Sequence, residues 1–168
     1  MMASKSTTQP RILIAGLGNS LLTDDGVGVH AVRRLAESRH FDDQPEVVVV
    51  EVGTAVLDAL HLFEWADHIV AIDAMRAGGE PGAIYQTAGD RVENPGLCDG
   101  LHELGLLNAM VLIPGAKRPP ISVIGIEPET IDYGLDLTAP VQAALPQVIA
   151  HTVALVESLR TVYAQSAA

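Results

Sequence analysis

The sequence predicts an α/β fold of three layers, in which a mainly parallel sheet of about five strands has helices on both faces. Short apolar runs alternate along the chain with segments of helical periodicity, which is typical of βαβ units. The runs Val47–Val50 and Ile69–Ile72 contain no alternating polar residue, so helices should cover both faces of these strands. We therefore expect both strands at the centre of the sheet.

The expected elements follow one another in this alternating order. Each predicted strand is a short apolar run, and each predicted helix repeats apolar residues at three- or four-residue spacing. The last helix has the longest apolar stripe, which includes Val141, Leu145 and Val148 and is interpreted as a face that packs on the core. The expected strands are 11–15, 47–52, 68–73, 83–87 and 121–126, and the expected helices are 26–37, 55–65, 101–113 and about 139–163.

Length and composition fit one domain, because 168 residues with 48% hydrophobic side chains can form a core of Val, Leu, Ile and Ala. We expect this domain at residues 11–163, with flexible tails at 1–10 and 164–168, where the sequence has no pattern. The polar start lacks the apolar stretch of a signal peptide, and no run approaches the about 20 apolar residues of a membrane helix. We therefore expect no association with membranes. We also expect the chain to be a monomer.

Charge and cysteine content restrict the partners and the compartment. The net charge is -11 with only 10 Lys and Arg residues, which argues against nucleic acid as a partner. Cys98 is the only cysteine, so no intramolecular disulfide can form and a reducing, cytoplasmic location is expected. Cys98 precedes His102 by four residues, but its irregular loop is a poor place to fix a nucleophile. We interpret it as a free thiol without a role.

The segment 16–28 is the most informative stretch, because it joins the first strand to the first helix through a Gly-rich turn with two adjacent carboxylates. A dinucleotide-binding turn needs a third glycine where this chain has Leu21. Asp24 and Asp25 would repel a phosphate and attract a cation, so the turn predicts a cation or proton-transfer site. We expect Asp24 to cap the helix 26–37, which leaves Asp25 for chemistry.

Two turns allow both a structural and a substrate-binding interpretation. Gly18 and Asn19 suit a tight turn, and their backbone could also form a platform against which a substrate strand lies. Gly53 and Thr54 follow the second strand, where Thr54 either caps the next helix or contacts substrate. We expect all four residues to contribute to substrate binding.

Three side chains are expected to converge at the carboxyl edge of the sheet. Asp25 follows the first strand and Asp73 ends the third, so both emerge where open α/β folds bind ligands. Asp73 ends a buried strand, where a carboxylate must find a partner or change its pKa. His102 begins the next helix and can supply an imidazole. Two carboxylates and one imidazole leave coordination positions open for water, as a catalytic divalent ion requires.

These residues resemble the motifs of the hydrogenase maturation endopeptidases, which trim the C-terminal tail from the large subunit of nickel-iron hydrogenases. The resemblance covers about residues 11–159, and its weight comes from five short motifs in the same order. The motifs are Gly16-Leu17-Gly18-Asn19 through Asp25-Gly26-Val27-Gly28, Gly53-Thr54, Asp73-Ala74, His102-Glu103-Leu104-Gly105-Leu106 and Glu127-Pro128-Glu129.

The resemblance implies that Asp25, Asp73 and His102 are the catalytic and metal-binding residues. It implies an endopeptidase that removes the C-terminal extension of the nickel-iron hydrogenase large subunit precursor after nickel insertion. The divalent metal would then be nickel carried by the substrate. Hydrolysis is either assisted by this metal or uses one carboxylate as a general base. The fold expected with this activity is phosphorylase/hydrolase-like.

Two other functions remain open at this point. A noncatalytic metal-binding or nickel-delivery chaperone would use the same three residues without shortening the large subunit. A peptidyl-tRNA hydrolase-like esterase has a strand and turn similar to Gly16–Asn19, but this chain has Ser20-Leu21 in place of Pro-Gly and lacks the basic surface that tRNA requires. The turn Glu127–Glu129 is a candidate for the rim of the site.

Overall fold

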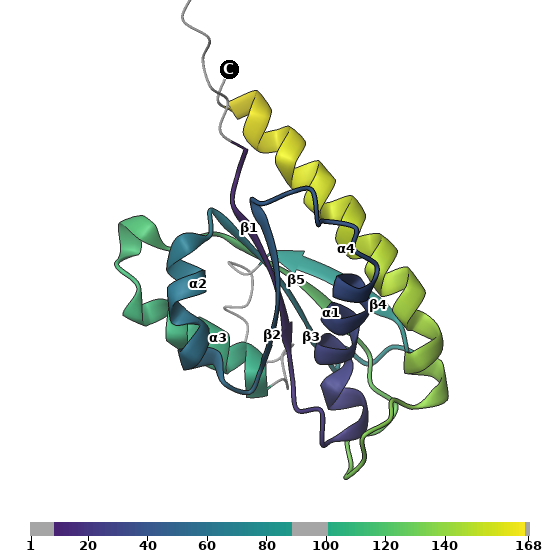
Figure 1. Ribbon diagram of the computed structural model, residues 1–168. Helices are drawn as coiled ribbons and strands as arrows, with labels where there is room; N and C mark the ends of the chain where they lie inside the picture. The colour runs from purple at the N-terminus through teal and green to yellow at the C-terminus, as the bar shows by residue number, and fades with distance from the viewer. Residues whose placement is uncertain (1–8, 89–100, 167–168) are drawn as a thin grey trace, which may run out of the picture.

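The structure is a computed structural model that describes residues 9–88 and 101–166. Five strands form one sheet in the order β2-β1-β3-β5-β4 (Figure 1). Strand β1 pairs in parallel with β2 and β3, β3 pairs in parallel with β5, and β4 pairs antiparallel with β5. The strands are β1 (Ile12–Leu17), β2 (Val47–Gly53), β3 (His68–Ala74), β4 (Ile84–Ala88) and β5 (Ile121–Ile126).

The α/β class is confirmed, and the sheet is mixed because of β4. Residues 75–83 connect β3 to β4 directly, and this connection is too short for the helical crossover that a parallel strand needs. Strand β4 therefore turns back and pairs on the far side of β5. Whether the fold is phosphorylase/hydrolase-like in detail stays a prediction.

The expectation that Val47–Val50 forms a central strand is wrong, because β2 is at the edge of the sheet. Val49 packs against the core on one face of the sheet, and Val48 and Val50 pack against the core on the other. The unbroken apolar run thus reports that both faces are covered. It does not report whether a neighbouring strand lies on each side.

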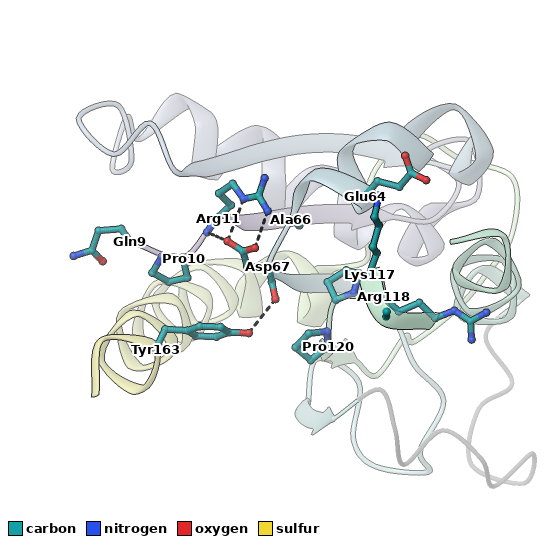
Figure 2. A pocket seen from close by; sticks show the side chains of 12 residues that line it. Gln9, Pro10, Arg11, Glu64, Ala66, Asp67, Lys117, Arg118, Pro120 and Tyr163 are labelled. Carbon is teal, nitrogen blue, oxygen red and sulfur yellow. Dashed lines mark hydrogen bonds and ion pairs between the residues drawn. The ribbon is translucent and has the colours of Figure 1, made fainter. Parts of the chain in front are cut away.

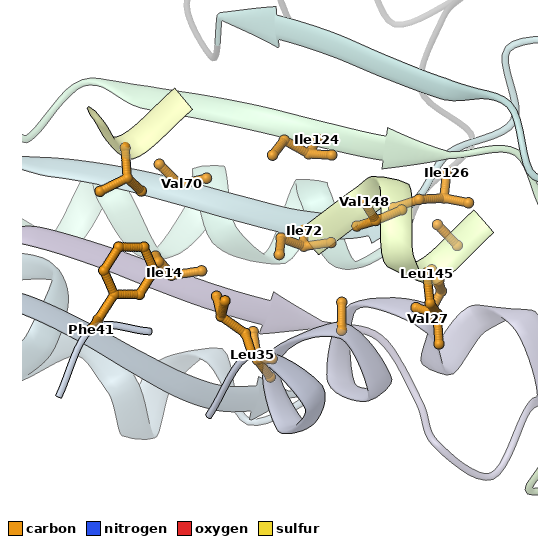
Figure 3. Packing of buried hydrophobic residues seen from close by; sticks show 14 of the residues in the cluster. Ile14, Val27, Leu35, Phe41, Val70, Ile72, Ile124, Ile126, Leu145 and Val148 are labelled. Atoms are coloured by element: carbon orange, nitrogen blue, oxygen red, sulfur yellow. The ribbon is translucent and has the colours of Figure 1, made fainter. Parts of the chain in front are cut away.

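One face of the sheet is covered by α1 (Val27–Glu37) and α4 (Ala139–Ser166), as Figures 1 and 3 show. Ile14 of β1 and Ile72 of β3 are fully or almost fully buried beneath these helices. Leu35 of α1 and Val148 of α4 belong to the same cluster. This packing confirms that the apolar stripe of the last helix faces the core.

The other face is covered by the 3-10 helix η2 (Val56–Ala59), α2 (Leu60–Trp65) and α3 (Leu101–Leu112). Leu13 of β1, Phe63 of α2 and Leu106 of α3 are buried in the core beneath them. The two cores lie on opposite sides of one sheet, which gives the three layers that the sequence predicts (Figure 1).

Glycines let α1 lie directly against the sheet. A Cβ on Gly28 would overlap the carbonyl oxygen of Ile72 in β3, and a Cβ on Gly16 would overlap the carbonyl oxygen of Gly28. Any larger residue would push α1 away from β1 and β3. The close approach matters for the site, because α1 follows directly from the turn that carries Asp25.

Helix α4 continues to Ser166, so residues 164–166 belong to its last turn and not to the expected flexible tail. By length and composition alone α4 could cross a membrane, with a mean hydropathy of 1.3. A helix that packs on a protein core is equally apolar. In α4, Val141, Leu145 and Val148 are fully buried against the sheet. The division of the chain into one domain with two tails otherwise stays a prediction.

Candidate active site

Gly18, in the loop after β1, lies next to both Asp25 and Asp73. Gly18 has a φ of +106°, which L side chains rarely adopt. A Cβ at this position would overlap the carbonyl oxygen of Asp25 and would lie 3.6 Å from Oδ1 of Asp73. The turn therefore requires glycine, and its tightness places the first carboxylate next to the end of β3.

The side chain of Asp25 is buried and oriented by the turn that precedes it. Its Oδ2 accepts a hydrogen bond of 2.8 Å from the backbone N–H of Asn19. The side chain of Asn19 shapes the same turn, because its Oδ1 accepts a hydrogen bond of 3.0 Å from the N–H of Leu21. Asn19 thus has the structural role that the sequence predicts, and contact of its backbone with substrate stays a prediction.

Asp73 is also buried, near the end of β3. Its Oδ1 accepts a hydrogen bond of 2.8 Å from the N–H of Ala74. Asp73 pairs with Gly125 of the neighbouring strand β5. A Cβ on Gly125 would lie only 2.6 Å from the Cβ of Met75, so the space beside the end of β3 requires glycine there. Two buried carboxylates close to one glycine form the part of the predicted cluster that the structure describes.

His102 lies in the first turn of α3. This helix packs on the sheet through Leu106 and Met110, and the chain enters β5 at the amino edge soon after α3 ends. The first turn of α3 is therefore directed toward the carboxyl edge, and the convergence of His102 with Asp25 and Asp73 stays a prediction. The side chain of His102, like the whole of Cys98, lies outside the described part of the structure. Among the described side chains no three His, Cys, Asp or Glu residues form a metal-binding cluster.

Asp24 does not cap α1, contrary to expectation. The N-cap of α1 is Gly26, without a side-chain hydrogen bond, because a 3-10 turn at Thr23–Gly26 precedes the helix. Asp24 is fully buried, and its carboxylate accepts four hydrogen bonds from the loop after β5. The donors are the N–H groups of Glu129 (2.9 Å) and Thr130 (3.2 Å) and the N–H and hydroxyl of Thr138 (2.7 and 2.8 Å).

The turn after β2 lies against the turn after β1. The N–H of Gly18 donates a hydrogen bond of 3.3 Å to the carbonyl of Gly53, which has a φ of +58°. Thr54 is exposed, and neither η2 nor α2 has a side-chain cap, so the capping interpretation of Thr54 is wrong. Its contact with substrate stays a prediction.

Glu127 is buried and not at the rim, unlike its neighbour Glu129, which is exposed. Its Oε2 accepts hydrogen bonds from the N–H of Ala77 (2.8 Å), the N–H of Gly79 (3.3 Å) and the hydroxyl of Tyr85 (3.0 Å). Burial raises the pKa of Glu127, but these hydrogen bonds outweigh burial and hold the pKa below its ordinary value. The ionised carboxylate of Glu127 therefore holds the loop after β3 in place.

A cavity of about 1030 Å³ lies at the opposite, amino edge of the sheet (Figure 2). Arg11 donates to both carboxylate oxygens of Asp67 there, at 3.1 and 2.8 Å, and these hydrogen bonds lower the pKa of Asp67. Lys117 and Tyr163 also line this cavity. It is open and distant from Asp25 and Asp73 in the topology, so it is not part of the candidate site.

Known proteins that resemble this chain are named for the formation or maturation of hydrogenases. The sequence model described as hydrogenase maturation protease (HycI) matches residues 29–159. The hydrogenase expression/formation protein HoxM of Azotobacter vinelandii is 33% identical over 143 residues, which are 82% of this chain and 68% of the relative. The hydrogenase 2 maturation protease of Escherichia coli is 31% identical over 150 residues, which are 83% of this chain and 89% of the relative.

The fold agrees with these sequence relations. The solved structure of the [NiFe] hydrogenase maturation protease HybD from Thermococcus kodakarensis superposes with a TM-score of 0.73 at 29% identity. The superposition covers 87% of this chain and 99% of that one. The family match spans most of the chain, and it begins after the turn that carries Asp25. The chain therefore belongs to the hydrogenase maturation protease family and is a peptidase.

Proposed function

We propose that this peptidase removes the C-terminal extension of a nickel-iron hydrogenase large subunit precursor after nickel has been inserted. One observation carries the proposal beyond family membership: the buried carboxylates of Asp25 and Asp73 both lie close to the turn Gly18-Asn19 at the carboxyl edge. Burying two neighbouring acidic groups is unfavourable for the fold. Such pairs occur at sites that bind a cation or transfer a proton.

The chemistry assigned to this pair is hydrolysis of one peptide bond. Water adds to the scissile carbonyl carbon, the C–N bond breaks, and the leaving amine takes up a proton. Asp25 and Asp73 supply oxygen ligands for the nickel ion that the precursor carries, and the imidazole of His102 is the third ligand in this proposal. The ion polarises the carbonyl. In a second version without the ion, one carboxylate accepts the proton from water.

The remaining partners and the location follow the sequence expectations. The substrate is the precursor itself, with Gly18, Asn19, Gly53 and Thr54 as the backbone and side-chain contacts along its tail. We place the reaction in the cytoplasm and assign the working form to a monomer. An acidic chain with a net charge of -11 has no nucleic-acid partner in this proposal.

The test is the mass of the large subunit. Nickel-loaded precursor is incubated with the wild-type chain and with Asp73→Asn, and intact mass spectrometry follows loss of the tail. We expect trimming by the wild type and none by Asp73→Asn, because the amide cannot act as a carboxylate ligand or base. The matched control is Asp58→Asn, which changes an exposed carboxylate of η2 and should trim at the wild-type rate.

Trimming by Asp73→Asn at the parental rate would contradict the assignment of this site. A wild-type chain that binds the precursor and leaves its mass unchanged would instead support the nickel-delivery chaperone.

A further inference from the structure

Exposed apolar side chains gather on two loops beside the candidate active site. Eight large apolar side chains are exposed in the described structure, and four of them lie in the segments 21–23 and 129–138. Tyr133 is 90% exposed and Leu135 is 66% exposed. We call the four residues the apolar rim: Leu21, Ile131, Tyr133 and Leu135.

The two loops form one continuous surface. Leu22 and Gly134 pair in an isolated parallel bridge, and the N–H of Gly134 donates to the carbonyl of Leu21 at 3.0 Å. Thr23 adds two bonds, from its N–H to the carbonyl of Gly134 at 2.9 Å and from its hydroxyl to the carbonyl of Thr130 at 2.9 Å. The apolar side chains are thus presented by an ordered base, and binding would not have to order a free loop.

Asp24 anchors this base from below and links it to the site. Its four hydrogen bonds hold both ends of the loop 129–138, and the next residue is Asp25. The N–H of Asp25 donates to the carbonyl of Leu22 at 3.0 Å. Figure 1 shows the loop after β5 beside the loop between β1 and α1, at the end of the molecule away from the C-terminus. A polypeptide bound at the candidate site therefore lies next to the apolar rim.

The charges around the apolar rim define the chemistry of its partner. Glu129, Asp132 and Asp136 are exposed in the same loop. Residues 119–159 contain no Lys or Arg, and neither do residues 12–32. The loop 129–138 therefore presents exposed apolar and acidic side chains together and carries no Lys or Arg. Such a surface complements an apolar segment that is flanked by basic residues.

We propose that the apolar rim is the docking surface for the hydrogenase large subunit precursor, which it binds through an apolar segment flanked by Lys or Arg. This inference rests on the proposed function, because the partner is the substrate of that reaction. It adds a contact remote from the scissile bond. Binding energy from such a contact holds the tail at the carboxylates.

The experiment measures the Kd of nickel-loaded precursor in the Asp73→Asn background, which binds without turnover. The test variant adds Tyr133→Ser and Leu135→Ser, and the matched control adds Leu112→Ser and Val162→Ser. The control side chains are 61% and 54% exposed near the amino edge. We expect the test variant to bind at least about 10-fold more weakly, as for loss of central interface residues. The control should stay within about 2-fold of the parent.

A third variant, Asp132→Asn with Asp136→Asn, tests the charge complementarity. Its Kd should depend less steeply on salt concentration than that of the parent. All these substitutions are at exposed positions, and thermal unfolding checks that each variant is folded. Equal salt dependence would overturn the basic character of the partner segment.

The outcomes separate this inference from the proposed function. If the test variant binds like the control while the wild type trims the precursor, docking on the apolar rim is wrong and the proposed function stands. If the wild type leaves the precursor mass unchanged but the test variant still binds it more weakly, the proposed function fails and the docking surface stands. If sedimentation shows a wild-type dimer that the test variant loses at unchanged precursor affinity, the occupant is a second copy of the chain and the proposal is overturned.

Discussion

At the scale of single residues, neighbouring carboxylates in the turn after β1 have different tasks. Asp25 faces the candidate site, whereas Asp24 accepts four hydrogen bonds from the loop 129–138. Removing Asp24 therefore leaves partly buried donors of that loop without their acceptor. Hydrogen bonds to a charged group contribute more than those between neutral groups, so this loss exceeds the effect of a missing helix cap.

We predict that Asp24→Ala lowers the free energy of unfolding by about 3 kcal/mol or more. For a chain of this length that corresponds to a fall in the thermal midpoint of roughly 6–12 °C. Calorimetry or circular dichroism measures the shift. The matched control is Asp43→Ala, which removes an exposed carboxylate and should change the free energy of unfolding by less than about 0.5 kcal/mol. A shift for Asp24→Ala no larger than for Asp43→Ala would refute the anchoring role.

Alanine substitutions at Gly18 and Gly78 distinguish the effect of steric overlap from the effect of backbone strain. Both have a positive φ, but a Cβ on Gly18 would overlap the carbonyl oxygen of Asp25, whereas a Cβ on Gly78 would meet nothing within 4 Å. Gly78→Ala should therefore lower the free energy of unfolding by about 1–2 kcal/mol through φ alone. Gly18→Ala should cost more and abolish trimming, because the turn must move Asp25 away from Asp73. Denaturant unfolding and the mass assay measure the two effects, and retained trimming by Gly18→Ala would contradict this geometry.

At the scale of elements, local patterns predicted the helices and strands well, and long-range contacts account for the errors. The apolar run of β2 indicated covered faces, but its edge position depends on which strands pair, and no local pattern records that. The partners of Asp24 are more than 100 residues away along the chain. A cap was the nearest local use for that carboxylate, so sequence reasoning chose it. The position of Asp25 and Asp73 at one edge could be predicted because strand ends in a parallel arrangement share one edge, and their role in catalysis stays a prediction.

His68 joins three elements at the amino edge. It begins β3, its Nε2 lies 3.0 Å from the hydroxyl of Ser122 in β5, and its Nδ1 lies 3.5 Å from the hydroxyl of Tyr163 in α4. Burial lowers the pKa of His68 from 6.5 to about 4. The unfolded chain takes up a proton as the pH falls through 6.5, and the folded chain does not do so until about pH 4.

The stability of the protein should therefore decrease between pH 6.5 and pH 4, with a contribution from His68 of up to about 3 kcal/mol. Above pH 6.5 both states are neutral at this residue, and its contribution no longer changes. Urea unfolding at several pH values measures the slope. His68→Gln removes the titrating group, so the decrease should be smaller in that variant over the same range. The lowered pKa values of Asp67 and Glu127 act below about pH 4.5 and are common to both proteins. Identical slopes for the two proteins would contradict a buried neutral His68.

At the scale of the whole molecule, the two edges of the sheet have separate tasks. The amino edge holds the exposed ion pair of Arg11 with Asp67 and the buried His68, both of which connect elements of the fold. The carboxyl edge holds Asp25, Asp73 and the anchored loop with the apolar rim. The acidic residues of the chain add a diffuse negative field, but salt screens it over about 8–10 Å. For the metal-bearing substrate of the proposed function, we therefore expect contacts at the carboxyl edge to contribute more to recognition than the overall net charge does.

This division leads to a prediction about the metal. The proposed set of two carboxylates and one imidazole leaves coordination positions open. The isolated chain should therefore bind nickel weakly, and the precursor should supply both the ion and its remaining ligands. We predict that enzyme stripped of metal trims nickel-loaded precursor and does not trim nickel-free precursor, as measured by intact mass. Asp25→Asn should lose trimming of the loaded form, whereas Asp58→Asn, which changes an exposed carboxylate of η2, should keep it. Equal trimming of loaded and nickel-free precursor by stripped enzyme, with chelator present, would rule out both nickel recognition and metal-assisted hydrolysis. The remaining mechanism would then be hydrolysis with one of the two carboxylates as the general base.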